Sequence, residues 1–141
     1  MLYNLFMKLD DNKDKGRAGL LLGMQYFGLQ GYTISLPIND TQWYDFVIEK
    51  NGKFETVQCK FTDTENSEVD FRSTGGTDGG VIGNILDYPL DYLFCANEKN
   101  SYVIPLSDIR KSGNKRSIVL KTEPNKNHQG FETYKYLVEI R

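Results

Sequence analysis

The feature that most constrains the fold of this chain is a pair of partly apolar segments joined by a two-residue turn at Asn51-Gly52. Residues 45–49 and 53–61 mix apolar side chains with β-branched and polar ones, and Asn-Gly supplies the backbone freedom that a tight reversal needs. The sequence therefore predicts two antiparallel strands that form a β-hairpin.

Three polar side chains interrupt the apolar pattern of this hairpin. Gln58 and Lys60 project from the same face of the second strand, because side chains alternate along a strand and these two are two residues apart. Asp45 opens the partner strand, where its carboxylate can point into the same space. Spacing alone leaves two interpretations open. One is a solvated Asp–Lys pair, which contributes a few tenths to about 1 kcal/mol, and the other is a functional cluster of acid, amide and amine.

Length and composition predict one folded domain over residues 1–141. The chain is 39% hydrophobic and contains nine Tyr and eight Phe residues, enough to bury a core. The net charge of −2 gives no overall basic field. Cys59 and Cys95 are too few for a disulfide framework, so we expect a reducing, cytoplasmic setting. The apolar start is shorter than a signal-peptide core and no run approaches membrane-spanning length, so no membrane partner is expected.

The remaining pattern predicts an α/β or α+β domain. Apolar residues at helical spacing predict a helix over 14–30, with Gly31 as its stop. We expect a short strand or helical turn at 1–7, strands at 32–38, 66–72, 91–97, 101–106 and 116–123, and a short helix at 105–110. The glycine-rich stretch 73–84 reads as a loop, and it lacks the Gly-Lys-Ser/Thr ending of a P-loop, so no nucleotide cofactor is expected.

Four stretches together resemble a PD-(D/E)xK nuclease. They are "KGRAG" at 15–19, the acid that ends "QWYD" at Asp45, "VQCK" with Gln58-Cys59-Lys60 in the place of (D/E)xK, and "DYLFCANEKNSYVIPLSDI" at 91–109. The Gln-x-Lys variant is similar to that of the cyanobacterial group I intron-encoded homing endonuclease of this fold. The resemblance covers roughly residues 13–122. It implies a restriction-endonuclease-like core with a mixed central β-sheet flanked by helices.

The resemblance also implies a function. A protein of this kind is a site-specific endonuclease of double-stranded DNA that hydrolyses phosphodiesters with Mg²⁺. Asp45, the Gln58 amide oxygen and the Cys59 backbone carbonyl would be metal ligands, since Mg²⁺ prefers oxygen donors. The Lys60 ammonium would hold the attacking water or stabilise the pentavalent phosphate. A neutral Gln58 lowers the number of anionic ligands, so we expect modest metal affinity that depends on the bound phosphate.

Leu20 departs from the family pattern. Relatives usually carry Glu directly after the second Gly of Lys-Gly-x-x-Gly, and this sequence has Leu there. Loss of that carboxylate would weaken metal binding or the positioning of water, and impair cleavage unless another acid substitutes. The other interpretation of Leu20 is an ordinary core residue.

Basic residues concentrate in one part of the sequence. Between residues 110 and 128, six Lys and Arg residues face Glu123 as the only acid. Lys and Arg near loops can contact DNA phosphates or simply keep a surface soluble. The candidate DNA-binding residues are Lys15, Arg17, Arg72, Ser73, Thr74, Lys111, Lys115 and Arg116.

Oligomer formation is expected, as a dimer or tetramer, because a small domain with one active site must pair to cut both strands. In the tail 131–141, Tyr and Phe alternate with charges, as in an exposed edge strand or interface element. Two other functions stay open: a DNA-binding or junction-binding protein that keeps the nuclease scaffold without hydrolysis, and a structural domain with a surface Asp–Lys pair.

Overall fold

The computed structural model describes residues 12–39, 41–74, 82–113 and 115–140. The prediction for residues 1–7 lies outside these ranges, as does the central part of the glycine-rich stretch.

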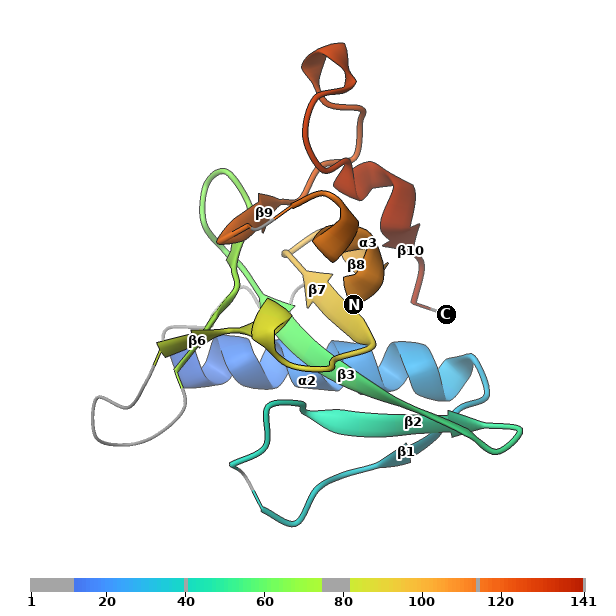
Figure 1. The fold of residues 1–141 in the computed structure, drawn as a ribbon. Helices are drawn as coiled ribbons and strands as arrows, with labels where there is room; N and C mark the ends of the chain where they lie inside the picture. Colours follow the sequence, from blue (N-terminus) through green and yellow to red (C-terminus); the bar gives the residue numbers. More distant parts are fainter. Residues whose placement is uncertain (1–11, 40, 75–81, 114, 141) are drawn as a thin grey trace.

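A six-stranded mixed sheet forms the centre of the fold (Figure 1). Its strand order is β1-β2-β3-β7-β8-β10. The bounds are β1 Thr33–Ser35, β2 Phe46–Lys50, β3 Lys53–Phe61, β7 Tyr92–Ala96, β8 Ser101–Pro105 and β10 Leu137–Val138. Neighbouring strands are antiparallel except β3 and β7, which run parallel. This confirms the predicted α/β fold with a mixed central sheet.

The predicted hairpin is β2 and β3. Phe46 pairs with Val57 and Lys50 with Lys53, which leaves Asn51 and Gly52 as the two turn residues. Both have positive φ values, 54° and 81°, the left-handed conformation that a two-residue hairpin turn requires. The turn therefore fixes the register of the hairpin and, with it, the direction of every side chain in β3.

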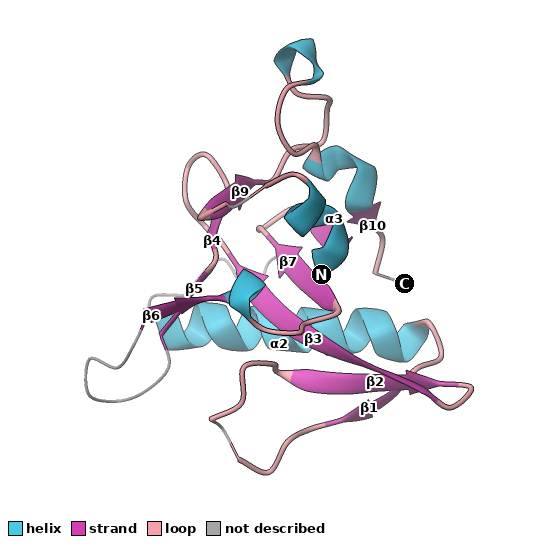
Figure 2. Cartoon of the chain, viewed as in Figure 1, coloured by secondary structure: helices cyan, strands magenta, loops and turns pink. Residues whose placement is uncertain are grey.

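Apolar side chains cover both faces of the central strands. On one face lies helix α2, Asn12–Leu29 (Figure 2). It packs Leu22 and Phe27 against Phe46 and Phe94 of the sheet. On the other face lies helix α3, Leu106–Lys111. In β7, Leu93 belongs to this second cluster while Phe94 belongs to the first, so this strand is buried on both sides.

Short strands extend the second face. Strand β4, Glu68–Asp70, pairs with β9, Ser117–Val119, and β5, Arg72–Thr74, pairs with β6, Ile82–Asn84. Three 3₁₀ helices follow at Ile85–Asp87, Lys126–His128 and Thr133–Tyr136. The single strand predicted over 66–72 is thus wrong. It divides at Phe71 into two strands with different partners, and the ends of the glycine-rich stretch are strands rather than loop.

The aromatic side chains of the tail are less exposed than predicted. Phe131 and Tyr136 are half-buried, with ring centroids 5.4 Å apart and nearly parallel planes. The Tyr136 hydroxyl donates a hydrogen bond to Asp108 of α3 at 2.9 Å. The edge-strand interpretation is confirmed for Leu137 and Val138, because β10 pairs with β8 at the margin of the sheet. Among the described residues, no helix is both long and apolar enough to span a membrane.

Candidate active site

A groove of about 1010 Å³ brings the predicted site residues together. It lies between the N-terminal half of α2, the C-terminal half of β3 and the segment of β4 and β5. Asp45, Gln58, Lys60 and Leu20 all line it. The three residues of the hairpin predicted to form the site, Asp45, Gln58 and Lys60, therefore line one hollow surface, and their roles there stay a prediction.

Strand alternation places Gln58 and Lys60. Val57 and Cys59 are buried in the apolar cluster shared with α2, so the residues between and after them project to the other side of the strand. Asp45 immediately precedes β2, and its backbone N–H donates to the Val57 carbonyl at 2.8 Å. Its carboxylate accepts a 2.6 Å hydrogen bond from the Cys59 amide, which fixes the acid against the centre of the Gln-x-Lys motif.

Asp45 and Lys60 are opposite charges in a partly dehydrated setting. Burial raises the pKa of the Asp45 carboxyl, while the Cys59 amide and the Lys60 ammonium act in the opposite direction. Burial lowers the pKa of Lys60, and the nearby charges of Asp45 and Asp70 oppose that change. The two groups thus stabilise one another's ionised forms against the cost of burial.

The Lys60 ammonium has a defined position. It donates a hydrogen bond to the backbone carbonyl of Arg72 at 3.1 Å, which ties β3 to the start of β5. The Gln58 amide nitrogen lies 3.5 Å from the Cys59 carbonyl oxygen, at the long limit of a hydrogen bond. The Gln58 side chain and the Cys59 carbonyl therefore lie next to each other at the groove, where both oxygens are potential ligands.

Helix α2 reaches the motif through two glycines. A Cβ atom at Gly19 would lie 3.2 Å from the Lys60 carbonyl carbon, and one at Gly23 would lie 2.7 Å from the Cys59 sulfur. The absence of side chains lets the helix pack directly against the segment that carries Gln58 and Lys60. Gly19 belongs to the "KGRAG" stretch and Gly23 lies outside it, but the four-residue spacing of the two glycines indicates that both lie on one helix face.

Leu20 has a mixed environment. It lines the groove and also packs at the margin of the apolar cluster beneath α2, and its side chain is only half-buried. Leu20 therefore has features of both interpretations, a position at the site and a packing residue of the core. A longer polar side chain here would project into the space that Asp45 and Lys60 share.

The predicted DNA-binding residues fall into separate groups. Lys15, Arg17 and Arg72 line the groove. Ser73 and Thr74 continue β5 beyond Arg72. Arg116 lines an adjoining pocket together with Arg72, whereas Lys115 lies on a different surface beside β9 and Lys111 ends α3 away from the groove.

The groove also contains acidic residues outside the predicted site. Asp63, Glu68 and Asp70 line it together with Asp45. Asp63 forms a 2.9 Å ion pair with Lys15. Asp70 holds the Arg72 guanidinium with hydrogen bonds of 2.8 and 2.5 Å, and these contacts lower the Asp70 pKa. No local pattern marks these acids, because the chain brings them to the groove through the turn after β3.

The donor atoms at the groove suit a hard divalent cation. Among the described residues, no three His, Cys, Asp or Glu side chains group closely enough to hold a metal ion by themselves. The Asp45 carboxylate, the Gln58 amide and the Cys59 carbonyl are all oxygen donors, as Mg²⁺ prefers. One carboxylate among three protein donors leaves the remaining positions to water and to a phosphate.

Comparisons with known proteins agree with this geometry. Among solved structures, the chain is similar to the bacterial homing endonuclease I-Ssp6803I, with a TM-score of 0.67 and 21% sequence identity, over 91% of this chain and 89% of that chain. At that identity the likeness establishes a shared fold. A comparison with curated proteins gives no match. The sequence profile of the PD-(D/E)XK endonucleases matches residues 11–136, which include the whole groove, so the chain belongs to the PD-(D/E)XK endonuclease family.

Proposed function

We propose that the protein is a site-specific endonuclease of double-stranded DNA that hydrolyses phosphodiester bonds with a divalent metal ion, Mg²⁺ in the first place. The observation that carries the proposal is the convergence of Asp45, Gln58 and Lys60 in one groove of a PD-(D/E)XK fold. The structural likeness to a homing endonuclease supports DNA as the substrate and a homing-type role.

Each residue of the motif has a distinct task in this proposal. Asp45, with the amide oxygen of Gln58 and the carbonyl of Cys59, would hold the cation. When bound, a divalent cation neutralises charge on the phosphoryl oxygens and lowers the pKa of a coordinated water. The Cys59 amide keeps the Asp45 carboxylate oriented toward the groove. Lys60 places a fixed positive charge beside the reacting phosphate, where negative charge increases in the transition state.

The test is metal-dependent nicking of supercoiled plasmid DNA. Lys60→Ala should reduce the cleavage rate by about 100-fold or more, the effect of losing one well-placed charge-stabilising group. Lys53→Ala is the matched control, because Lys53 is in the same strand but exposed at the far end of the hairpin. Asp45→Asn should abolish metal-dependent cleavage while the carbonyl of its side chain can still accept the Cys59 hydrogen bond. Wild-type cleavage without added metal, or equal rates for the two Lys variants, would contradict the proposal.

A second candidate function is DNA or junction binding without hydrolysis. Leu20 favours it, because an apolar side chain lines the groove at the position where relatives carry Glu. Salt-dependent binding of duplex or branched DNA, together with no nicking in any divalent metal, would identify this function.

A further inference from the structure

The groove that holds Asp45 and Lys60 carries little net charge with which to retain a polyanion. Among the described residues, its cationic side chains are Lys15, Arg17, Lys60 and Arg72, and its acidic ones are Asp45, Asp63, Glu68 and Asp70. Two of the cations are already in ion pairs inside the groove, Lys15 with Asp63 and Arg72 with Asp70. Affinity for a DNA backbone depends on cations that can replace counterions at phosphates. The described residues of this groove can therefore supply only part of that affinity.

A second hollow has the charge that the first lacks. It lies between β9 and the loop 125–131, has a volume of about 460 Å³, and is called the β9 groove below. Among the described residues, its lining contains Lys115, Lys121 and Lys126 and no acid. Within the described part of the chain, none of these three lysines forms an ion pair, and Lys121 and Lys126 are exposed.

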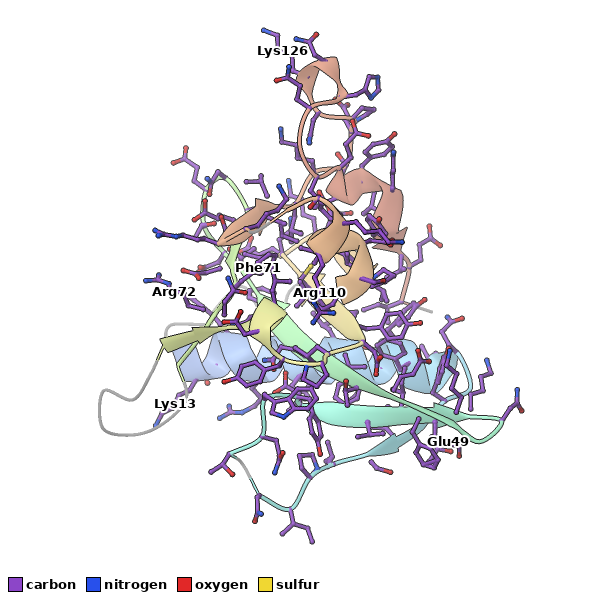
Figure 3. All side chains as sticks on the ribbon, viewed as in Figure 1. Lys13, Glu49, Phe71, Arg72, Arg110 and Lys126 are labelled. Atoms are coloured by element: carbon purple, nitrogen blue, oxygen red, sulfur yellow. The ribbon has the colours of Figure 1, made fainter. Side chains whose placement is uncertain are left out.

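The loop that forms one wall of the β9 groove is internally braced. The Asn125 side chain donates to the carbonyls of Gln129 and Phe131 at 2.8 and 3.1 Å. Asn127 and His128 both have positive φ, so the loop turns sharply at its tip, where Lys126 projects (Figure 3). A braced loop holds its cation in place before a ligand arrives, which reduces the entropy lost on binding.

The opposite wall is equally well supported. The Thr133 hydroxyl donates to the Val119 carbonyl at 2.8 Å and accepts from the Lys121 amide at 2.9 Å, so the 3₁₀ helix after the loop is tied to the end of β9. Phe131 stacks on Tyr136 and presents an apolar surface beside the lysines. Amide groups of Asn125 and Gln129 complete the lining.

The β9 groove is connected to the catalytic groove across the surface. A pocket of about 500 Å³ lies between them and shares Glu68, Asp70 and Arg72 with the catalytic groove and Ser117 with the β9 groove. Arg116 lines this middle pocket. A single extended ligand can therefore follow one path from Lys60, past Arg116, to Lys121 and Lys126.

We propose that the β9 groove binds backbone phosphates of the same DNA duplex that the catalytic groove cuts, through Lys121 and Lys126. This rests on the proposed function for the identity of the ligand. The catalytic groove then contributes chemistry and the β9 groove contributes affinity. Lys121 and Lys126 are phosphate-binding residues that the DNA contacts expected from the sequence did not include.

The test is the salt dependence of binding to a synthetic mixed-sequence duplex in EDTA, where cleavage does not intervene. In a Lys121→Gln/Lys126→Gln double variant, the slope of log affinity against log salt should fall by about 2, because each lost phosphate contact removes about 0.9 from the slope. Affinity at low salt should fall about tenfold or more. The Lys121→Arg/Lys126→Arg variant should keep both values. The matched control is Lys53→Gln/Lys99→Gln, which removes two exposed lysines that line none of the described grooves.

The possible results separate this inference from the proposed function. A wild-type slope and affinity in the Lys121/Lys126 Gln variant would overturn the inference and leave the β9 groove to another anionic partner, such as an acidic protein. An equal loss in the Lys53/Lys99 control would also overturn it. Duplex binding that depends on Lys121 and Lys126, in a protein that does not nick DNA with any divalent metal, would support the β9 groove while refuting the proposed nuclease. Unfolding midpoints of all variants should match the wild type, since both side chains are exposed.

Discussion

Leu20 is the residue at which the chemistry of the groove can be changed by one substitution. We expect Leu20→Glu to increase metal-dependent cleavage about tenfold or more, since a carboxylate that gains even 1.4 kcal/mol in the transition state has that effect. The half-buried position of Leu20 at the groove leaves room for the charge to be hydrated. DNA affinity should change little.

The matched control for Leu20→Glu is Leu21→Glu. Leu21 is the next residue of α2, is 49% exposed and does not line the groove. Single-turnover rates of both variants are the measurement. A Leu20→Glu protein that is only less stable, with no gain in cleavage, would show that Leu20 acts mainly as an apolar packing residue.

Tyr136 offers a test of the pH dependence of stability. Burial, followed by the hydrogen bond to Asp108, raises its pKa to about 12 from a usual value of 10.0. The folded state therefore favours the protonated hydroxyl, and this stabilisation is fully present below pH 10 and lost as the pH rises toward 12. Tyr136→Phe should lower the free energy of unfolding by about 1 kcal/mol at pH 7.

The difference between wild type and Tyr136→Phe should shrink above pH 10. Urea unfolding between pH 7 and pH 11 measures it. Tyr134→Phe serves as control, since no hydrogen bond of the Tyr134 hydroxyl occurs in the described part of the chain. A constant difference across this range would mean that the hydrogen bond to Asp108 does not control the titration.

At the scale of residues, the sequence predicts the positions of site residues that follow from the geometry of one hairpin. It does not predict the positions that depend on how distant strands pair. Gln58 and Lys60 share a face because of their spacing, and the turn at Gly52 then places Asp45 opposite them. Asp70 could not be predicted in the same way. Its approach to Lys60 depends on where β4 lies, and β4 is held by a strand nearly fifty residues later, through pairs such as Val69 with Ile118.

The contact between α2 and β3 is the element-scale feature that supports the site. We expect Gly23→Ala to destabilise the protein by about 1 to 3 kcal/mol, the usual cost of overpacking, because the new methyl group would lie 2.7 Å from the Cys59 sulfur and 3.2 Å from the Phe94 ring. The helix would have to move away from the strand that carries Gln58 and Lys60. Cleavage should therefore fall along with stability.

Gly28→Ala is the control for Gly23→Ala. Gly28 is in the same helix, and its added methyl group would meet only the end of the Ile34 side chain at an ordinary 3.9 Å. This substitution should be neutral or stabilise by about 0.5 to 1 kcal/mol, since Ala favours helix over Gly. Thermal unfolding of both variants is the measurement, and equal effects would contradict the proposed close packing at Gly23.

The sequence predicts those elements whose bounds depend on neighbouring residues. It does not predict those whose bounds depend on pairing with distant parts of the chain. The helix expected over 14–30 is α2 at Asn12–Leu29, and the hairpin bounds follow from Asn51-Gly52. In contrast, Phe71 separates β4 from β5 because its amide bonds to Arg116 and its carbonyl to Ile85, in two different parts of the chain. No periodicity within residues 66–72 contains that information.

Self-association is the prediction that belongs to the whole molecule. In the proposed function, a chain that uses the groove of Asp45 and Lys60 cuts one strand at a time, so we expect a dimer or tetramer at micromolar concentration, at least on DNA. The most exposed of the large apolar side chains are Leu36 and Ile38, which follow β1, and Phe54 at the start of β3, whereas Leu137 of the tail is less exposed. Sedimentation velocity with and without duplex DNA is the measurement. Monomers under both conditions would contradict the expectation.

The parallel pairing of β3 with β7 also determines when the central sheet can form during synthesis of the chain. Val57 lies beside Tyr92, 35 positions later, so the loop between them must be made before the centre of the sheet can close. At synthesis rates of about 5–20 residues per second, the β3 edge stays open for about 2–7 s after the hairpin has left the ribosome. That edge is rich in β-formers and is a template for pairing with other chains. Substitutions that slow the pairing of β7 with β3 should therefore lower the yield of soluble protein more than they lower its melting temperature.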